Sequence, residues 1–356
     1  MVVGIDVRFA GTHSGLGRYT RELTKKLVSR GDPLKYVLFV RSKNEEWLKG
    51  LPKDVTIFPA PFAHYSVDEQ LHFPKLLRVS GIDLLLSPHF NVPLRSPVPF
   101  VVTIHDLILH RYPNQASLPR RLAYRFLMNR VMAKAERIIT VSHFVADEIA
   151  ATYGKKMSDR VEVVYEGVDD VYKPVLEAKA REALRACGVE RPYLLYVGNA
   201  KQHKNVQTLL DAFARLKRSD LSLVLVTGGP ESASLQLPPR AKLLHDVAEH
   251  HLPALYTMAD CFVTASLYEG YGLPVVEALA CGCPVIAADR GALNEIAKGR
   301  AFFANPTVES FTEAMNRLPS RKPPVVLGTW EEAAKKTATI LLDLRTSKKI
   351  FPAAKH

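Results

Sequence analysis

Short apolar runs alternate with amphipathic segments along the whole sequence, and this alternation limits the fold more than any other feature. Runs such as VVGIDV, FVVTIHD and LSLVLVTGG are rich in Val, Ile and Leu and bounded by turn residues, which is typical of buried strands. The segments between them carry apolar residues at helical spacing; VSHFVADEIAATYG, for example, begins with a capping Ser142 and ends at Gly154. Apolar strands separated by helices predict a parallel sheet covered on both faces.

The expected strands form two sets in series. The first set is VVGIDV, YVLFV, VTIFPA, DLLLSP, FVVTIHD, RIITVS and VEVVYEG, and the second is YLLYVGN, LSLVLVTGG, AKLLHD, CFVTAS, PVIAAD and AFFAN. Two such sets predict an α/β protein with two Rossmann-like domains, and a length of 356 residues agrees with two domains. The seam GVDDVYKPV places the first domain at residues 1–172 and the second at 173–328, with a C-terminal helix within residues 329–356.

The net charge of +12 favours an anionic partner: a nucleotide, a phospholipid surface or nucleic acid. Residues 1–170 and the remainder each carry 24 basic and 18 acidic side chains, so there is no polybasic arm, and no motif for reading bases supports nucleic acid. The four cysteines lack CxxC spacing, and no run reaches the roughly 18 apolar residues of a membrane-spanning helix. We therefore expect a cytoplasmic protein without a signal peptide, disulfide framework or zinc site.

The stretch EGYGLPVVE, residues 269–277, has the features of a binding loop. Gly270, Gly272 and Pro274 exclude a helix until about Pro274, a residue that suits the first helical position. Glu269 then lies in the loop, and Glu277 lies one turn inside the helix. A diphosphate over the helix start would leave Glu277 to accept hydrogen bonds from ribose hydroxyls and Glu269 from those of a sugar. Paired glycosidase carboxylates are the alternative, but they leave the other phosphate-type loops without a role.

Three other loops follow expected strands, where open α/β sheets bind ligands. Gly15 and Gly17 in GTHSGLGRYTREL suit a phosphate near a helix N-terminus, or simply a tight turn. His105 in THDL can contact a substrate or pair with its neighbour Asp106. Lys204 in VGNAKQHKN precedes a helix, where it either meets a phosphate or remains a solvated lysine.

With these residues the chain resembles the retaining glycosyltransferases of family 4, a large group that uses nucleotide-activated sugars and has the GT-B architecture. The resemblance covers nearly the whole chain. Its most specific part is SLYEGYGLPVVEALACGCPVIA, supported by the glycine loop at Gly17, THDL, VSHF, VYEGVD and VGNAKQHKN. It implies two Rossmann-like domains facing across a cleft, with the acceptor on the N-terminal domain and the nucleotide sugar on the C-terminal one. It also implies a last helix that crosses back to the first domain.

The resemblance further implies roles for single residues. Glu277 would hold the ribose, Glu269 the donor sugar and Lys204 the diphosphate, while His105 would lie near the reacting carbon. The expected set is catalytic His105, Glu269 and Lys204, with donor-binding Gly15, Gly17, Asn199, Lys204, Glu269, Gly270, Tyr271, Gly272, Leu273 and Glu277. No metal and no resident cofactor are expected, because no suitable loop carries a DxD motif; the nucleoside diphosphate sugar is a co-substrate.

Three positions depart from the family pattern. Asn199 and His203 stand where different subgroups of relatives carry an arginine, so the diphosphate would rely on Lys204, the helix ends and Arg18. Glu166 stands where asparagine is usual, which either alters the site or is tolerated.

The mechanism expected from the resemblance needs charge on the departing β-phosphate to be stabilised, which Lys204 and helix N-termini can do. Retention without an evident nucleophile implies attack on the face that the leaving group departs from. Glu269 as a covalent nucleophile is the alternative, and it predicts a glycosyl-enzyme adduct. HDLILHRYP resembles mannosyl- and rhamnosyltransferases of cell-envelope assembly, so GDP-mannose is the first expected donor. A non-catalytic nucleotide-sugar sensor or a GT-B-type epimerase would share the fold and is the competing function.

The segment SLPRRLAYRFLMNRVMAKAER, residues 117–137, is basic and amphipathic. It either lies on an anionic membrane surface or forms a buried helix with a solvated basic edge. The first interpretation suits a polyprenyl-linked acceptor and a peripheral position on the inner face of the plasma membrane, while a saccharide acceptor is the other candidate.

Overall fold

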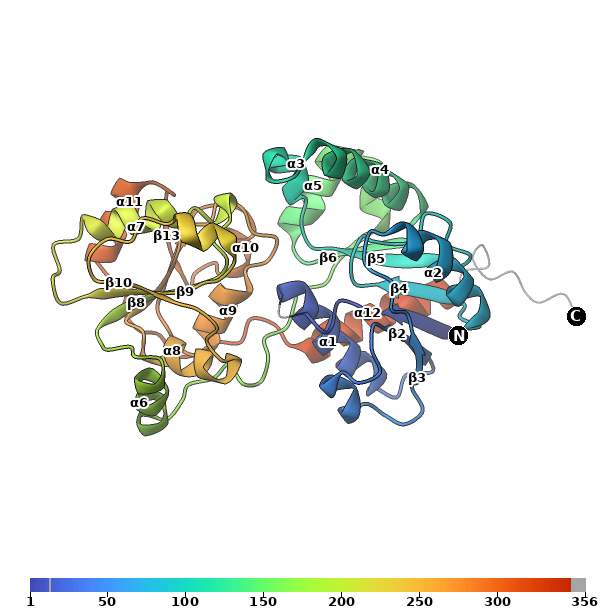
Figure 1. The fold of residues 1–356 in the computed structure, drawn as a ribbon, viewed down its shortest axis with the longest axis horizontal. Helices are drawn as coiled ribbons and strands as arrows, with labels where there is room; N and C mark the ends of the chain where they lie inside the picture. Colours follow the sequence, from blue (N-terminus) through green and yellow to red (C-terminus); the bar gives the residue numbers. More distant parts are fainter. Residues whose placement is uncertain (13, 347–356) are drawn as a thin grey trace, which may run out of the picture. The chain divides into compact units, whose positions relative to one another are not determined.

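The computed structural model describes residues 1–12 and 14–346 and divides the chain into two compact units (Figure 1). The first unit comprises Met1–Gly167 and the segment from Gly328 onward, and the second comprises Val168–Leu327. The boundaries fall at 167/168 and 327/328, beside the expected 172/173 and 328/329. The end of the expected C-terminal helix, residues 347–356, lies outside the described residues.

The first unit contains a parallel sheet with the strand order β3-β2-β1-β4-β5-β6-β7. Its strands are β1 (Val2–Asp6), β2 (Lys35–Val40), β3 (Thr56–Pro59), β4 (Leu84–Ser87), β5 (Phe100–Ile104), β6 (Arg137–Thr140) and β7 (Val161–Val163). Val3 of β1 pairs with Tyr36 on one side and Leu84 on the other. The strand order therefore reverses between β1 and β4, and the loops that follow these strands lie at the position where such sheets bind ligands.

Helices cover both faces of this sheet (Figure 1). They are α1 (Gly15–Val28), α2 (Val67–Val79), α3 (Ile108–Arg111), α4 (Leu118–Lys134), α5 (His143–Tyr153) and α12 (Trp330–Thr346), with 3-10 turns η1 (Glu46–Gly50), η2 (Pro113–Gln115) and η3 (Lys155–Arg160). α2, α4 and α5 share one hydrophobic core with the sheet. α12 packs on α1, where the Trp330 ring meets Tyr19 edge-on and Glu331 pairs with Lys26. The C-terminal helix therefore belongs to the first unit.

The second unit contains another parallel sheet, with the order β10-β9-β8-β11-β12-β13. Its strands are β8 (Tyr193–Val197), β9 (Ser222–Val226), β10 (Ala241–Leu244), β11 (Cys261–Thr264), β12 (Val285–Ala288) and β13 (Phe302–Ala304). Its helices are α6 (Glu177–Ala186), α7 (Val206–Ala214), α8 (Leu252–Met258), α9 (Leu273–Ala280), α10 (Leu293–Ile296) and α11 (Val308–Asn316), with 3-10 turns η4 (Gln202–Lys204), η5 (Pro230–Ser234) and η6 (Glu249–His251). Here the order reverses between β8 and β11, so the loops after these two strands meet.

Every expected strand is present and lies within the stretch that predicts it, except that β2 begins one residue before YVLFV, whereas two helices are shorter than expected. The sequence GRYTRELTKKLVSRG predicts a helix as far as Gly31, but α1 ends at Val28. The sequence NVQTLLDAFARLKRS has apolar residues at helical spacing beyond Ala214, where α7 ends. In α7 the last turn tightens, because the amides of Arg215 and Leu216 bond to carbonyls three residues back. The tighter turn ends the regular α-helix at Ala214, although the helical spacing of apolar side chains continues after it.

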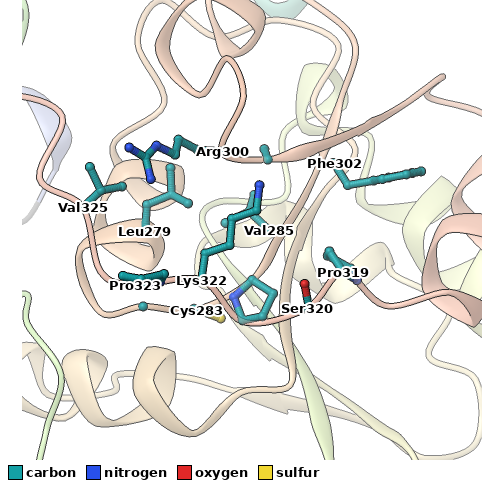
Figure 2. A pocket seen from close by; sticks show the side chains of 13 residues that line it. Leu279, Cys283, Val285, Arg300, Phe302, Pro319, Ser320, Lys322, Pro323 and Val325 are labelled. Carbon is teal, nitrogen blue, oxygen red and sulfur yellow. The ribbon is translucent and has the colours of Figure 1, made fainter.

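The segment between α11 and α12 crosses the amino-terminal end of the second sheet. A cavity of about 130 Å³ lies there, and Cys283 and Val285 at the start of β12, Phe302 of β13 and Lys322 of the connecting segment border it (Figure 2). Arg321 of this segment donates hydrogen bonds to the carbonyls of Gly282 (2.7 Å) and Ala259 (2.6 Å). These carbonyls follow the C-termini of α9 and α8, where a cation is favourable.

Removing this tie should destabilise the second unit. Arg321→Ala leaves two helix-end carbonyls without their charged donor, and we expect a loss of about 1–2 kcal/mol in the free energy of unfolding. For a domain of this size the loss lowers Tm by roughly 2–8 °C, measurable by calorimetry. Lys298→Ala is the matched control, because Lys298 is an exposed cation on the same unit. Equal melting temperatures for the two variants would show that the Arg321 hydrogen bonds do not stabilise the unit.

Candidate functional site

Two loops of the second unit meet where its strand order reverses. η4 follows β8 and carries Lys204, and the loop after β11 carries Glu269. The amide of Leu267 donates to the carbonyl of His203 at 2.7 Å, which fastens the two loops together. Lys204 Nζ lies 2.6 Å from Glu269 Oε1 and 2.7 Å from Oε2. The ion pair is largely buried, with 17% and 14% of the two side chains exposed, so this edge of the sheet holds a cation and an anion in direct contact.

A glycine turn leads from Glu269 into α9. Gly272 has φ of 100°, and a Cβ there would lie 2.6 Å from Leu293 Cδ2, so only glycine fits. α9 begins at Leu273, with Pro274 in its first turn, one residue before the expected start. The helix N-terminus and the preceding turn therefore lie beside Lys204 and Glu269, and both supply main-chain N–H groups that favour an anion.

Glu277 lies inside α9 and only 3% of it is exposed. Its Oε2 accepts a hydrogen bond from the hydroxyl of Tyr256 at 2.9 Å. Burial, followed by the charge of Glu277, raises the pKa of Tyr256 well above its ordinary value, so the phenol keeps its proton. One carboxylate oxygen of Glu277 is thus held by a neutral donor.

The two positions that depart from the family pattern near Lys204 differ in their surroundings. Asn199 is exposed, and its carbonyl accepts from the Tyr196 hydroxyl at 2.7 Å. His203 is buried, and burial followed by the charge of Lys204 lowers its pKa to about 4. His203 is therefore neutral at pH 7, and the charge in this loop comes from its lysines.

In the first unit His105 lies directly after β5, within hydrogen-bond distance of two acceptors. Its Nδ1 is 3.1 Å from Glu166 Oε1, and its Nε2 is 2.9 Å from the carbonyl of Pro88. Burial alone lowers the pKa of His105, but the Glu166 hydrogen bond and charge, together with the Pro88 carbonyl, raise it overall. Because both partners can accept, these two contacts favour the ring form that carries a proton on each nitrogen.

The glycine loop after β1 has a packing explanation of its own. Ser14 caps α1, and its Oγ accepts from the Gly17 amide at 3.1 Å. A Cβ on Gly17 would lie 2.1 Å from the Thr12 carbonyl oxygen, so glycine is required by that contact. Gly15 is exposed as the first residue of α1. The donor-binding role of Gly15 and Gly17 stays a prediction.

The structure thus brings the predicted residues together in two groups. Lys204, Glu269, Glu277 and the turn from Gly270 to Leu273 form one group on the second unit, and Gly15, Gly17 and His105 belong to the first unit. Sequence reasoning missed Tyr256, because a tyrosine in the apolar helix LPALYTM gives no signal of its partner. Glu166 was noticed only as a departure, and its pairing with His105 depends on the fold.

The described residues contain neither a metal-binding cluster nor a membrane-spanning helix. Among residues 1–12 and 14–346 we find no cluster of three or more His, Cys, Asp or Glu side chains suited to a metal ion. Within the same residues none of the helices combines the length and the apolar character needed to span a bilayer.

Comparison with known proteins gives matches to both units. The family model described as Glycosyl transferases group 1 matches residues 185–337, and the model described as Glycosyltransferase Family 4 matches residues 13–172. Both models describe glycosyltransferases, and together they cover most of the chain.

Individual proteins agree with these models. The O-antigen chain mannosyltransferase RfbU of Salmonella typhimurium is 27% identical over 257 residues, which is 70% of this chain and 68% of that protein. The O-antigen chain mannosyltransferase B of Escherichia coli is 29% identical over 232 residues, 62% of this chain and 60% of the relative, less than two thirds of its length. The solved structure of Anabaena HepE in complex with UDP and glucose has a TM-score of 0.71 at 19% identity, covering 98% and 100% of the two chains. At that identity the likeness shows a shared GT-B fold.

Proposed function

We propose, from the premise that the chain belongs to the GT-B glycosyltransferases of the group 1 and family 4 type, that it uses a nucleoside diphosphate sugar. The sugar is transferred to a saccharide or a lipid-linked acceptor during synthesis of a cell-envelope glycan. The observation that carries this proposal is the Lys204–Glu269 pair beside the glycine turn of α9, at the reversal of strand order. The similar O-antigen chain mannosyltransferases support the glycan class.

The donor's parts match the groups at this edge. A diphosphate needs a cation and N–H donors, which Lys204 and the start of α9 supply. A ribose offers two neighbouring hydroxyl donors, which suit the buried carboxylate of Glu277. Glu269 then accepts from hydroxyls of the transferred sugar once Lys204 turns to the phosphate.

The proposed reaction retains configuration and uses no metal. The bond between the anomeric carbon and the diphosphate oxygen breaks, and a bond from the acceptor oxygen forms on the same face. The acceptor's proton passes to the departing phosphate oxygen. Lys204 and the N-terminus of α9 stabilise the charge on the leaving group. The close contact of both Glu269 oxygens with Lys204 suits a hydroxyl acceptor better than a covalent nucleophile.

The donor base is tested by thermal stabilisation with UDP, GDP, ADP and dTDP, each with and without EDTA. GDP is the expected ligand, because the phrase HDLILHRYP and the similar mannosyltransferases both favour GDP-mannose. A ligand at about 100 times its Kd adds about 2.7 kcal/mol to the stability of the native state. Glu277→Ala should lose this stabilisation, since the ribose loses its acceptor. A shift that disappears with EDTA overturns the metal-free reaction, and binding without turnover of any donor and acceptor favours a sensor.

A further inference from the structure

A groove of about 810 Å³ opens on the first unit between α4 and the loops that follow β3, β4 and β5. Its lining is mostly apolar: Tyr65, Phe90, Leu109, Tyr124 and Phe126 contribute rings or aliphatic carbon. The centroid of the Phe90 ring lies 4.0 Å from that of His89, with the two rings tilted by 37°, and the adjacent Pro88 carbonyl accepts from His105. One end of the groove therefore adjoins the loop that holds the predicted reacting centre.

The other side of the groove continues into an apolar strip on α4. Leu118, Leu122 and Phe126 are 62%, 59% and 61% exposed and lie on one helix face, four residues apart. Tyr124 and Met128, on a different face, are buried in the core. The apolar side chains of the segment 117–137 are thus divided between the core and the surface. The segment is neither a helix with its whole apolar face on the surface nor a buried helix with only a basic edge exposed.

All the charged side chains of α4, the helix beside the groove, are basic. The helix carries Arg120, Arg121, Arg125, Arg130 and Lys134, and no acidic residue between Leu118 and Lys134. Arg120 lines the groove itself. An anionic group at the opening would therefore meet basic side chains, while the apolar strip beside it suits hydrocarbon.

The inner end of the groove is polar and fixed. Asn91 lines it and is 1% exposed; its Nδ2 donates to Glu69 at 2.8 Å, and Glu69 pairs with the buried Arg8 at 2.6 Å. Asn91 Oδ1 is buried and accepts no hydrogen bond from the described residues. A buried acceptor without a donor is costly, and a ligand hydroxyl would satisfy it.

We propose that this groove takes the acceptor as an amphiphile, a glycan joined through phosphate to a hydrocarbon chain. The sugar end reaches Asn91 and donates a hydroxyl to Oδ1, the phosphate meets Arg120, which lines the groove, and the hydrocarbon lies along Leu118, Leu122 and Phe126. This inference rests on the proposed glycosyl transfer and names the acceptor class within it. A free saccharide would leave the apolar strip and the basic helix without a role.

The hydrocarbon and phosphate ends are tested with farnesyl diphosphate, titrated below its micelle concentration and followed by calorimetry. We expect saturable binding that neither farnesol nor inorganic diphosphate reproduces. Leu122→Asp with Phe126→Asp should weaken binding at least tenfold, and Arg120→Ala about as much. Val79→Asp is the matched control, since Val79 is 74% exposed on α2 and does not line the groove. Absence of binding, or equal binding by Leu122→Asp/Phe126→Asp and Val79→Asp, overturns the proposal.

Two further arms separate the sources of a signal. Sedimentation with phosphatidylglycerol vesicles, in the absence of farnesyl diphosphate binding, would show a membrane surface without an occupied groove and would also overturn the proposal. Nucleotide binding on the second unit is measured in parallel. If nucleotide binding and turnover with a free saccharide persist while farnesyl diphosphate fails to bind, the transferase function stands and the groove assignment falls. If farnesyl diphosphate binds but no donor is consumed, the groove assignment stands and the transferase function falls.

Discussion

Replacing Lys204 with alanine is expected to lower kcat by about 10²–10³-fold, because it removes the cation nearest to the charge that builds on the leaving diphosphate. His203 cannot substitute for it, since burial keeps that imidazole neutral at pH 7. The affinity for the nucleoside diphosphate should also fall, because a charge-assisted contact is lost. Release of nucleoside diphosphate from the donor identified by thermal stabilisation measures the first effect, and calorimetry measures the second.

Lys201→Ala is the matched control for this change. Lys201 lies in the same loop and is exposed, so its removal alters the net charge equally without touching Glu269. We expect kcat of this variant to stay within about threefold of the wild type, as for an exposed charge. If Lys204→Ala behaves like Lys201→Ala, the diphosphate lies elsewhere and the donor-site assignment is wrong.

Glu269→Gln examines the same ion pair from its other side. The amide keeps the length of the side chain but no longer neutralises Lys204, so the site becomes more positive. We expect the nucleoside diphosphate to bind about as tightly as before or up to about tenfold tighter, while kcat falls at least tenfold because a carboxylate acceptor for sugar hydroxyls is lost. A parallel loss of affinity and turnover would instead indicate that Glu269 mainly supports the loop.

The fold was predictable because short apolar runs separated by amphipathic helices leave few arrangements other than parallel sheets. Even the short β13 lies within AFFAN, as expected. Helix ends were less predictable: the apolar period of α7 continues past Ala214, but the last turn closes through three-residue bonds that the period does not record. Such endings depend on local hydrogen bonds rather than on the pattern of side chains.

The parts of the site that lie within one loop were predictable from the sequence. The contacts between residues far apart in the sequence were not. Gly272 and Pro274 predict a turn that leads into a helix, and the structure has this turn and helix. The hydrogen bond from Tyr256 to Glu277 joins two different helices, and the contact between His105 and Glu166 spans 61 residues. Lys204 and Glu269 were expected near the same ligand, but their direct ion pair follows from the reversal of strand order between β8 and β11.

The pair of His105 and Glu166 leads to a prediction about pH, which depends on all the groups that face the ring. Besides Glu166, these are Asp106, which raises the pKa of His105, and His89, whose own pKa is well below its usual value because it is buried. Tyr19, edge-on at 4.4 Å, has a pKa raised by burial and stays neutral. Glu166 has the closest described contact with the ring, because its Oε1 lies 3.1 Å from His105 Nδ1.

Because the folded pKa of His105 is raised, its protonated form stabilises the fold fully below about pH 6.5, the unfolded value. This contribution is lost as the pH rises through the raised folded pKa. Glu166→Gln removes the charge that holds the proton, so we expect it to destabilise the chain by about 1–3 kcal/mol at pH 6 and by less at pH 9. Glu162→Gln, the same substitution on β7, is the control and should show no such change with pH.

The same substitution should move the activity profile. If the imidazolium form of His105 acts in transfer, kcat of the wild type falls as the pH rises through the raised pKa, and in Glu166→Gln this alkaline limb shifts to lower pH because burial then lowers the pKa of the ring. A structural role alone would lower stability without displacing the limb. An unchanged limb together with normal turnover at every pH would show that the charge on His105 serves only the fold.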